Sequence, residues 1–96
     1  MSEAIRIDKF LWFVRLAKTR NVAQAIVTAG RIRVAGRIIE RAHAQVHVGD
    51  ILTFPLHGRV RVIRVEAIPE RRGPAPEAQS CYTDLAPATE AIDIAI

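Results

Sequence analysis

The spacing of apolar side chains changes abruptly at Gly30, and this change constrains the fold more than any other feature. Before Gly30, apolar residues recur at intervals of three and four, as on a helix with one buried face. After Gly30 they alternate with polar residues, as on a half-buried strand. A helical segment followed by strands within 96 residues predicts one α+β domain, with two helices packed on a small, mostly antiparallel sheet.

Two helices are predicted before Gly30. The first runs from about Asp8 to Leu16. Thr19 is predicted to cap the second, because its hydroxyl can accept a hydrogen bond from the free amides of the first helical turn. The second helix runs to about Ala29, and Gly30 ends it.

The strands are predicted to begin with a hairpin over residues 31–39 that turns at Gly36. Ala35 is a poor residue for a turn in which both central residues have positive φ, so a type II or bulged turn is favoured. Turns at Gly49-Asp50 and His57-Gly58 bound the next strand.

A long strand is predicted after Gly58, with Val60, Val62 and Val65 facing inward around an irregularity near Ile63. The proline- and glycine-rich residues 69–76 are predicted to form a linker, and residues 76–85 a short helix. The final residues, 88–96, are predicted to be a strand or a loose tail. These assignments divide the chain into a domain over residues 5–68 and an appendage over residues 69–96.

The charge of the chain is concentrated in its first part. Residues 1–41 hold nine basic and three acidic side chains, a net charge of +6. Residues 42–96 hold five arginines and seven acids, a net charge of −2. A basic segment beside an acidic one indicates an anionic partner for the first, with nucleic acid as the first candidate and an anionic membrane surface as the second.

The junction between the two predicted helices combines several features of a phosphate site. Lys18 and Arg20 flank Thr19, where the second helix offers free amides and the positive end of its dipole. Arg15 lies one turn earlier and Gln24 one turn later, so both extend the same patch. The alternative is an ordinary capped helix whose flanking bases are solvated.

The predicted hairpin is a second basic element. Arg31, Arg33 and Arg37 are expected to line one strand face and its turn, with no acidic residue between Arg31 and Ile39. The guanidinium group suits phosphate and stacks on exposed bases. The alternative is a solvated sheet face.

Other candidate residues point away from catalysis. His43 and His47 have the spacing of a helical zinc motif but lie in a loop-to-strand stretch without the accompanying glutamate, so no metal site is expected. Cys81 is expected to be a small buried side chain. Trp12 is interpreted as packed under residues 76–85, with stacking on a nucleobase as the alternative.

These motifs, in this order and spacing, resemble the RNA-binding domain named after ribosomal small-subunit protein four, the S-four domain. The resemblance extends from "RIDKFLWFVRLAKTRNVAQAIVTAGRIRVAGR" to "VHVGD". It departs from the family at Ala35, where asparagine is usual. The stretches "DKFLWFVRLAKTR" and "RRGPAPEAQSCYTDL" are further similar to the bacterial fifteen-kilodalton heat-shock protein family, although that family usually ends in a longer, basic tail.

The resemblance implies binding of structured RNA without catalysis, most specifically ribosomal RNA of large subunits that carry peptidyl-tRNA. The alternatives are an accessory acting in trans with an RNA-modifying enzyme, or a DNA-binding protein that takes single-stranded or duplex DNA without specificity. A cytoplasmic monomer without cofactor, metal or membrane partner is expected. The expected RNA-binding residues are Arg6, Lys9, Arg15, Lys18, Thr19, Arg20, Gln24, Arg31, Arg33, Gly36 and Arg37.

Overall fold

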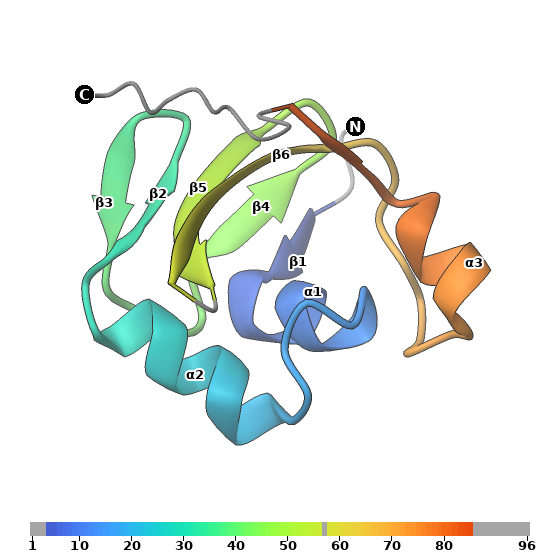
Figure 1. Ribbon diagram of the computed structural model, residues 1–96, viewed down its shortest axis with the longest axis horizontal. Helices are drawn as coiled ribbons and strands as arrows, with labels where there is room; N and C mark the ends of the chain where they lie inside the picture. The colour runs from blue at the N-terminus through green and yellow to red at the C-terminus, as the bar shows by residue number, and fades with distance from the viewer. Residues whose placement is uncertain (1–3, 57, 86–96) are drawn as a thin grey trace.

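The computed structural model describes residues 4–56 and 58–85, which form two helices packed against one face of a sheet and a third, short helix at the side (Figure 1). The helices in this part of the chain are α1 (Ile7–Phe13), α2 (Arg20–Thr28) and α3 (Ala75–Gln79). The strands are β1 (Ala4–Arg6), β2 (Ile32–Val34), β3 (Arg37–Ile39), β4 (Gln45–His47), β5 (Ile51–Leu56), β6 (Arg59–Val65) and β7 (Tyr82–Asp84).

The main sheet has the order β3-β2-β5-β6-β7 within the described residues, and every neighbouring pair is antiparallel. Strands β1 and β4 form a separate antiparallel pair beside α1. The predicted α+β architecture is therefore confirmed.

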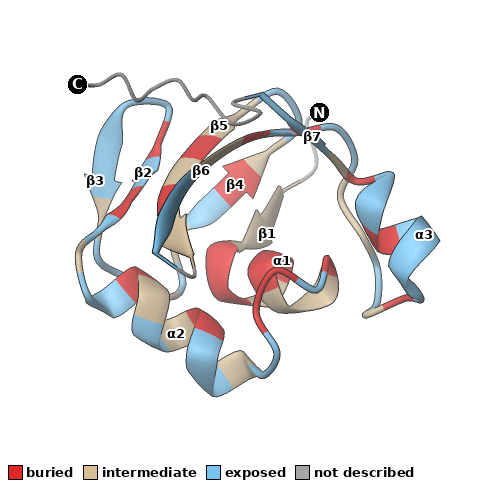
Figure 2. Cartoon of the chain, viewed as in Figure 1, coloured by how far each residue is buried: buried red, intermediate tan, exposed pale blue. Residues whose placement is uncertain are grey.

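The core lies between the helices and one face of the main sheet (Figure 2). Alternate residues of β2, β5 and β6 point into it, as the period of two requires. The largest fully buried apolar side chains are Ile7, Phe10, Leu11, Val14, Val27, Ile32, Val46, Leu52, Phe54, Ile63 and Val65.

The first helix ends earlier than its apolar spacing predicts. It stops at Phe13, three residues before the expected end, because Arg15 adopts a left-handed φ of 65°. The backbone amides of Leu16 and Ala17 then both donate to the carbonyl of Leu11, at 3.0 Å each. Residues 14–19 thus form a compact connection, called here the helix junction.

The beginning of α2 is as predicted. The Thr19 side chain accepts a hydrogen bond of 3.1 Å from the amide of Val22, so its role as the helix cap is confirmed. Gly30 follows the end of the helix with a φ of 74°, a conformation that glycine adopts without a steric cost.

The turn between β2 and β3 differs from the prediction. Val34 pairs with Arg37, and the two residues between them have φ values of 53° for Ala35 and 86° for Gly36. Two positive φ values define a type I′ turn, so the prediction of a type II or bulged turn is wrong. The type I′ turn matches the twist of the hairpin, and Ala35 accepts the unfavourable backbone conformation.

The inward face of β6 was predicted correctly at Val65 but incorrectly at Val60, and the predicted irregularity near Ile63 is absent from the β5–β6 pairing. The pairing of β5 with β6 is continuous from Ile51 with Arg64 to Leu56 with Arg59, without an irregularity. This register turns Ile63 and Val65 inward, whereas Val60 is 64% exposed. The register is set by pairing with β5, which the sequence of β6 does not reveal.

The C-terminal part of the described chain folds back onto α1. Residues 66–74, called here the return segment, have no regular structure and lead from β6 to α3. The helix predicted over residues 76–85 is shorter, because Tyr82–Asp84 pair with β6 as strand β7. The predicted strand or tail at residues 88–96, and His57 of the predicted turn, lie outside the described residues. No helix in the described part is long and apolar enough to cross a membrane.

Candidate nucleic-acid interface

A fully buried carboxylate, that of Asp8, lies between the two helices of the expected interface. Arg6 donates two hydrogen bonds to it, of 3.1 and 3.0 Å, and Gln24 donates one of 3.2 Å. The Lys9 amide donates a further one of 2.8 Å, and Arg20 Nε lies 3.5 Å from the same carboxylate. Asp8 therefore holds three expected RNA-binding side chains, those of Arg6, Arg20 and Gln24, around one buried point.

The environment of Asp8 keeps it ionised. Burial by itself raises the pKa of Asp8, because it removes the charged form from water. The hydrogen bonds from Gln24 and Arg6, the charge of Arg6 and the hydrogen bond from the Lys9 amide act in the opposite direction and outweigh burial. The pKa of Asp8 consequently lies below its usual value of 3.8.

Arg20 is less free than the sequence indicates. It was expected to be an exposed phosphate ligand, but its side chain is only 38% exposed. Its Nε atom is buried and makes no hydrogen bond within the described residues, although it lies in ion-pair range of Asp8. The ion pair orients the guanidinium group at the first residue of α2 while leaving hydrogen-bonding capacity unused.

The helix junction contacts the return segment through two arginines. Arg15 Nε donates a hydrogen bond of 2.6 Å to the Gly73 carbonyl. In the opposite direction, Arg72 donates from Nε to the Trp12 carbonyl at 3.0 Å and from Nη2 to the Lys18 carbonyl at 3.3 Å. Arg15 and Lys18 are exposed, and Thr19 next to them is exposed as well.

Trp12 is half-buried and packs against the core. The guanidinium carbon of Arg72 lies 5.9 Å from the centre of its ring, within cation–π range. Phe13 lies beside it, with ring centres 5.6 Å apart. The Trp12 ring is thus partly covered by the return segment, which precedes residues 76–85, the segment that was expected to cover it.

The arginines of the hairpin were expected to share one face, but Arg33 and Arg37 lie on opposite sides of it. Arg33 is opposite Ile38 in the β2–β3 register, so both point away from the helices. Arg37 is opposite Val34, which points toward the core, so Arg37 lies on the other side of the ribbon. The two-residue turn sets this register, and it places Arg37 on the side opposite to the one that the sequence pattern predicted.

Most bases of the first part of the chain have no acidic partner among the residues that the structure describes. Within residues 4–56 and 58–85, ion pairs to carboxylates involve Arg6 and Arg20 but no other base before residue 42. Lys9 instead places its ammonium 5.9 Å from the Phe13 ring centre. The bases without an ion pair in this part of the structure are Lys9, Arg15, Lys18, Arg31, Arg33, Arg37 and Arg41.

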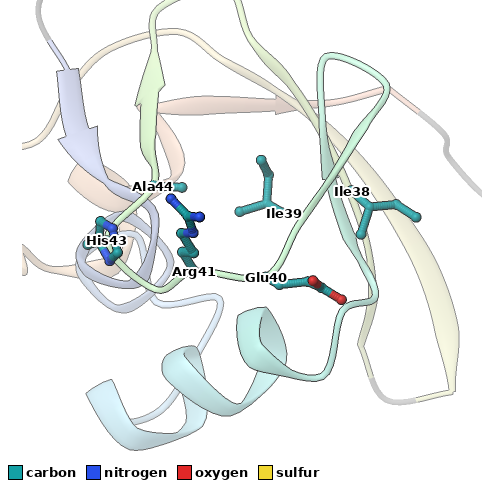
Figure 3. A pocket seen from close by; sticks show the side chains of 6 residues that line it. All are labelled: Ile38, Ile39, Glu40, Arg41, His43 and Ala44. Atoms are coloured by element: carbon teal, nitrogen blue, oxygen red, sulfur yellow. The ribbon is translucent and has the colours of Figure 1, made fainter.

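A shallow, open depression of about 410 Å³ lies beside the hairpin (Figure 3). Its lining residues are Ile38, Ile39, Glu40, Arg41, His43 and Ala44. Within the described chain, no group of three His, Cys, Asp or Glu side chains could hold a metal ion. Cys81 is buried as expected. Burial raises the pKa of its thiol, as does the nearby charge of Glu77, and together they outweigh the hydrogen bond with Ser80, which lowers it.

Two positions in this arrangement had no assigned role in the sequence-based prediction. Asp8 carries a local signal, since an acid two residues after Arg6 at a helix start can pair with it. Arg72 carries no such signal, because its backbone partners lie 54 and 60 residues earlier in the chain.

Comparison with known proteins gives consistent matches over this region. The model of the S4 domain family matches residues 5–52, half of the chain. The Heat shock protein 15 homolog of Haemophilus influenzae is 33% identical over 82 residues, which are 83% of this chain and 60% of that protein. The chain thus spans only about three fifths of the length of that relative.

Two further matches cover nearly all of the similar protein. The RQC P-site tRNA stabilizing factor of Listeria innocua is 31% identical over 85 residues, which are 88% of this chain and 90% of that protein. A trimeric structure of Vibrio cholerae Heat Shock Protein 15 aligns with a TM-score of 0.83 and 30% identity, and covers 97% of this chain and 98% of that one.

Proposed function

Because this chain belongs to the S4-domain family, we propose that it binds structured RNA without catalysing a reaction, through the helix junction and the β2–β3 hairpin. The observation that carries the proposal is the group of seven bases before residue 42 that have no acidic partner among the described residues. Cations whose charge is not neutralised by a carboxylate are available to phosphates, and phosphate contacts supply a large share of the affinity for nucleic acids.

The two basic elements are separated by the length of one helix. Helix α2 has nine residues and therefore spans about 14 Å. Lys18 lies before its first residue and Arg31 after its end, beside the hairpin. Phosphates of one folded RNA can thus contact both ends of α2, and shape rather than base sequence provides much of the recognition.

The hairpin suits contact with two RNA segments at once. Arg33 lies on the outer side of the ribbon and Arg37 on the side that carries the core residues. We propose that one side faces ribosomal RNA of the large subunit and the other faces peptidyl-tRNA. The relative named RQC P-site tRNA stabilizing factor supports this choice of partner, and the target implies a cytoplasmic protein.

Co-sedimentation with purified large subunits, with and without peptidyl-tRNA, tests the proposal. We expect stronger binding to subunits that carry peptidyl-tRNA, measurably weaker binding for Lys18→Ala, and loss of binding for Arg33→Glu. Arg59→Ala is the matched control, because Arg59 is an exposed base without an ion pair in the described structure but lies at the β5–β6 turn. Equal binding to both subunit forms would remove the recycling role and leave a general RNA-binding module.

The same preparation discriminates the remaining alternatives. Competition with duplex and single-stranded DNA at equal nucleotide concentration is expected to displace the protein poorly. Efficient competition by DNA would indicate a DNA-binding protein instead. The sequence predicts a monomer, while the similar Vibrio cholerae protein is trimeric in its solved structure. A stable trimer in sedimentation of the free chain would replace the monomer in the proposal.

A further inference from the structure

The return segment, which lies outside the matched residues 5–52, contacts the helix junction and the end of α1. Two hydrogen bonds join the return segment to the junction, a third joins it to Trp12 at the end of α1, and the residues they connect are 54 to 60 positions apart in sequence. We propose that Arg72 is a positioning residue, which holds Lys18 and the start of α2 in the geometry that binds RNA phosphate. The proposal rests on the proposed function of the junction.

The guanidinium group of Arg72 connects the two sides of the junction. Its Nε atom donates to the Trp12 carbonyl on α1, and its Nη2 atom donates to the Lys18 carbonyl just before the cap of α2. The planar, rigid fork fixes the separation of these two carbonyls, which a flexible ammonium group cannot do. The orientation of the Lys18 backbone relative to α1 is therefore set by a residue from the return segment.

The charge of Arg72 also fits the end of α1. This helix has no basic residue of its own in its last turn. Its terminal carbonyls carry partial negative charge, which a cation stabilises. Arg72 supplies that cation and at the same time covers the Trp12 ring, with 5.9 Å between its guanidinium carbon and the ring centre.

The return segment is itself held at both ends. The amide of Glu66 donates to the Cys81 carbonyl at 2.8 Å, where the segment leaves β6. Ala78 on α3 is buried in the core, and its amide donates to the Pro74 carbonyl at 2.9 Å. In addition, Arg15 Nε donates to the Gly73 carbonyl, so the junction and the segment hold each other from opposite sides.

Arg71 provides the matched comparison. It is adjacent in sequence and equally charged, but it is exposed and pairs with Glu77 of α3 instead of the junction. Of these two arginines, Arg72 is the one whose described contacts reach the junction. The two single substitutions therefore separate positioning from general charge.

The test measures RNA affinity for single and double variants, together with amide hydrogen exchange. Arg72→Ala is expected to weaken binding roughly fivefold, and Arg71→Ala by less than about twofold. Arg72→Lys is expected to lose as much as Arg72→Ala, because it keeps the charge but not the fork. In a Lys18→Ala background, Arg72→Ala should add less than about twofold, since both act through the same contact.

Two affinity results would overturn the proposal. Full affinity in Arg72→Lys would mean that Arg72 acts as a charge, and independent effects of Arg72→Ala and Lys18→Ala would mean that Arg72 contacts RNA separately. If Lys18→Ala leaves RNA binding unchanged, the proposed function of the junction fails instead. In that case, amide hydrogen exchange of the free protein tests whether Arg72 positions the junction. Arg72→Ala should speed exchange of the Leu16 and Ala17 amides but not that of the Ile63 amide. Unchanged exchange at the junction would refute the positioning role.

Discussion

Replacing Asp8 by asparagine should destabilise the protein strongly and weaken RNA binding with it. The substitution keeps the size of the side chain but removes the charge that Arg6 and Arg20 share. Removing one partner of a buried ion pair costs about 3–5 kcal/mol, because the other charges stay buried and uncompensated. The two arginine side chains are 42% and 38% exposed and can turn partly to water, so we expect the lower end, about 3 kcal/mol.

Thermal unfolding followed by circular dichroism measures this change. For a domain of this size, about 3 kcal/mol corresponds to a fall in Tm of about 12 °C or more. The acid dependence is a second readout. Because the pKa of Asp8 is lower in the folded than in the unfolded protein, its contribution is fully present above about pH 4 and is lost as the pH falls through the folded pKa. The difference between Asp8→Asn and wild type should therefore shrink on acidification.

Asp84→Asn is the control for this experiment. Asp84 is also paired with an arginine, Arg61, but its side chain is 52% exposed. An exposed ion pair contributes at most about 1 kcal/mol, so the control should change Tm only slightly. Equal Tm changes in the two variants would refute the role of Asp8 in holding the helices and their arginines together. A stability difference between Asp8→Asn and wild type that stays constant down to about pH 3 would also refute it.

Three shorter predictions follow from other features. Ala35→Asn should raise Tm by a few degrees in a thermal shift assay, because the left-handed φ of 53° costs alanine roughly 1 kcal/mol; a lower Tm would contradict the turn assignment. RNA affinity should fall log-linearly with salt, with a slope of about −0.7 to −0.9 per phosphate contact, and a flat response would exclude the bases from the interface. Trp12 emission should change little on adding RNA, since the ring packs on the core and under Arg72, whereas strong quenching would assign it to base stacking.

Local features of the sequence predicted local structure well. The extent of α2 and its cap at Thr19 depend on contacts within a few residues, and both were predicted correctly. The inward face of β6 and the side of the hairpin that carries Arg37 depend on strand register. Register is set by pairing and by the turn, and at Ala35 the requirements of the hairpin overrode the preference of the residue.

In the candidate interface, too, local features were predicted from the sequence and long-range contacts were not. The unpaired bases at the helix junction and hairpin were identified from charge spacing alone, and their role in RNA binding stays a prediction. Spacing did not reveal that Asp8 draws Arg20 and Gln24 together, because the two helices must first pack. The contact of Arg72 with the Lys18 carbonyl required the whole sheet to bring residues 54 positions apart together.

The position of β6, α3 and β7 late in the chain affects how the protein can fold during its own synthesis. Residues 5–52 carry the family match, but the core they enter also contains Phe54, Ile63, Val65, Ala78 and Cys81. Strand β2 gains its second neighbour only when β5 is available. A nascent chain that has emerged as far as residue 52 therefore exposes the apolar faces of α1, α2 and β2 without a partner layer. We expect folding to wait until residues through Cys81 have left the exit tunnel, so the segment defined by the family is not an autonomous cotranslational folding unit.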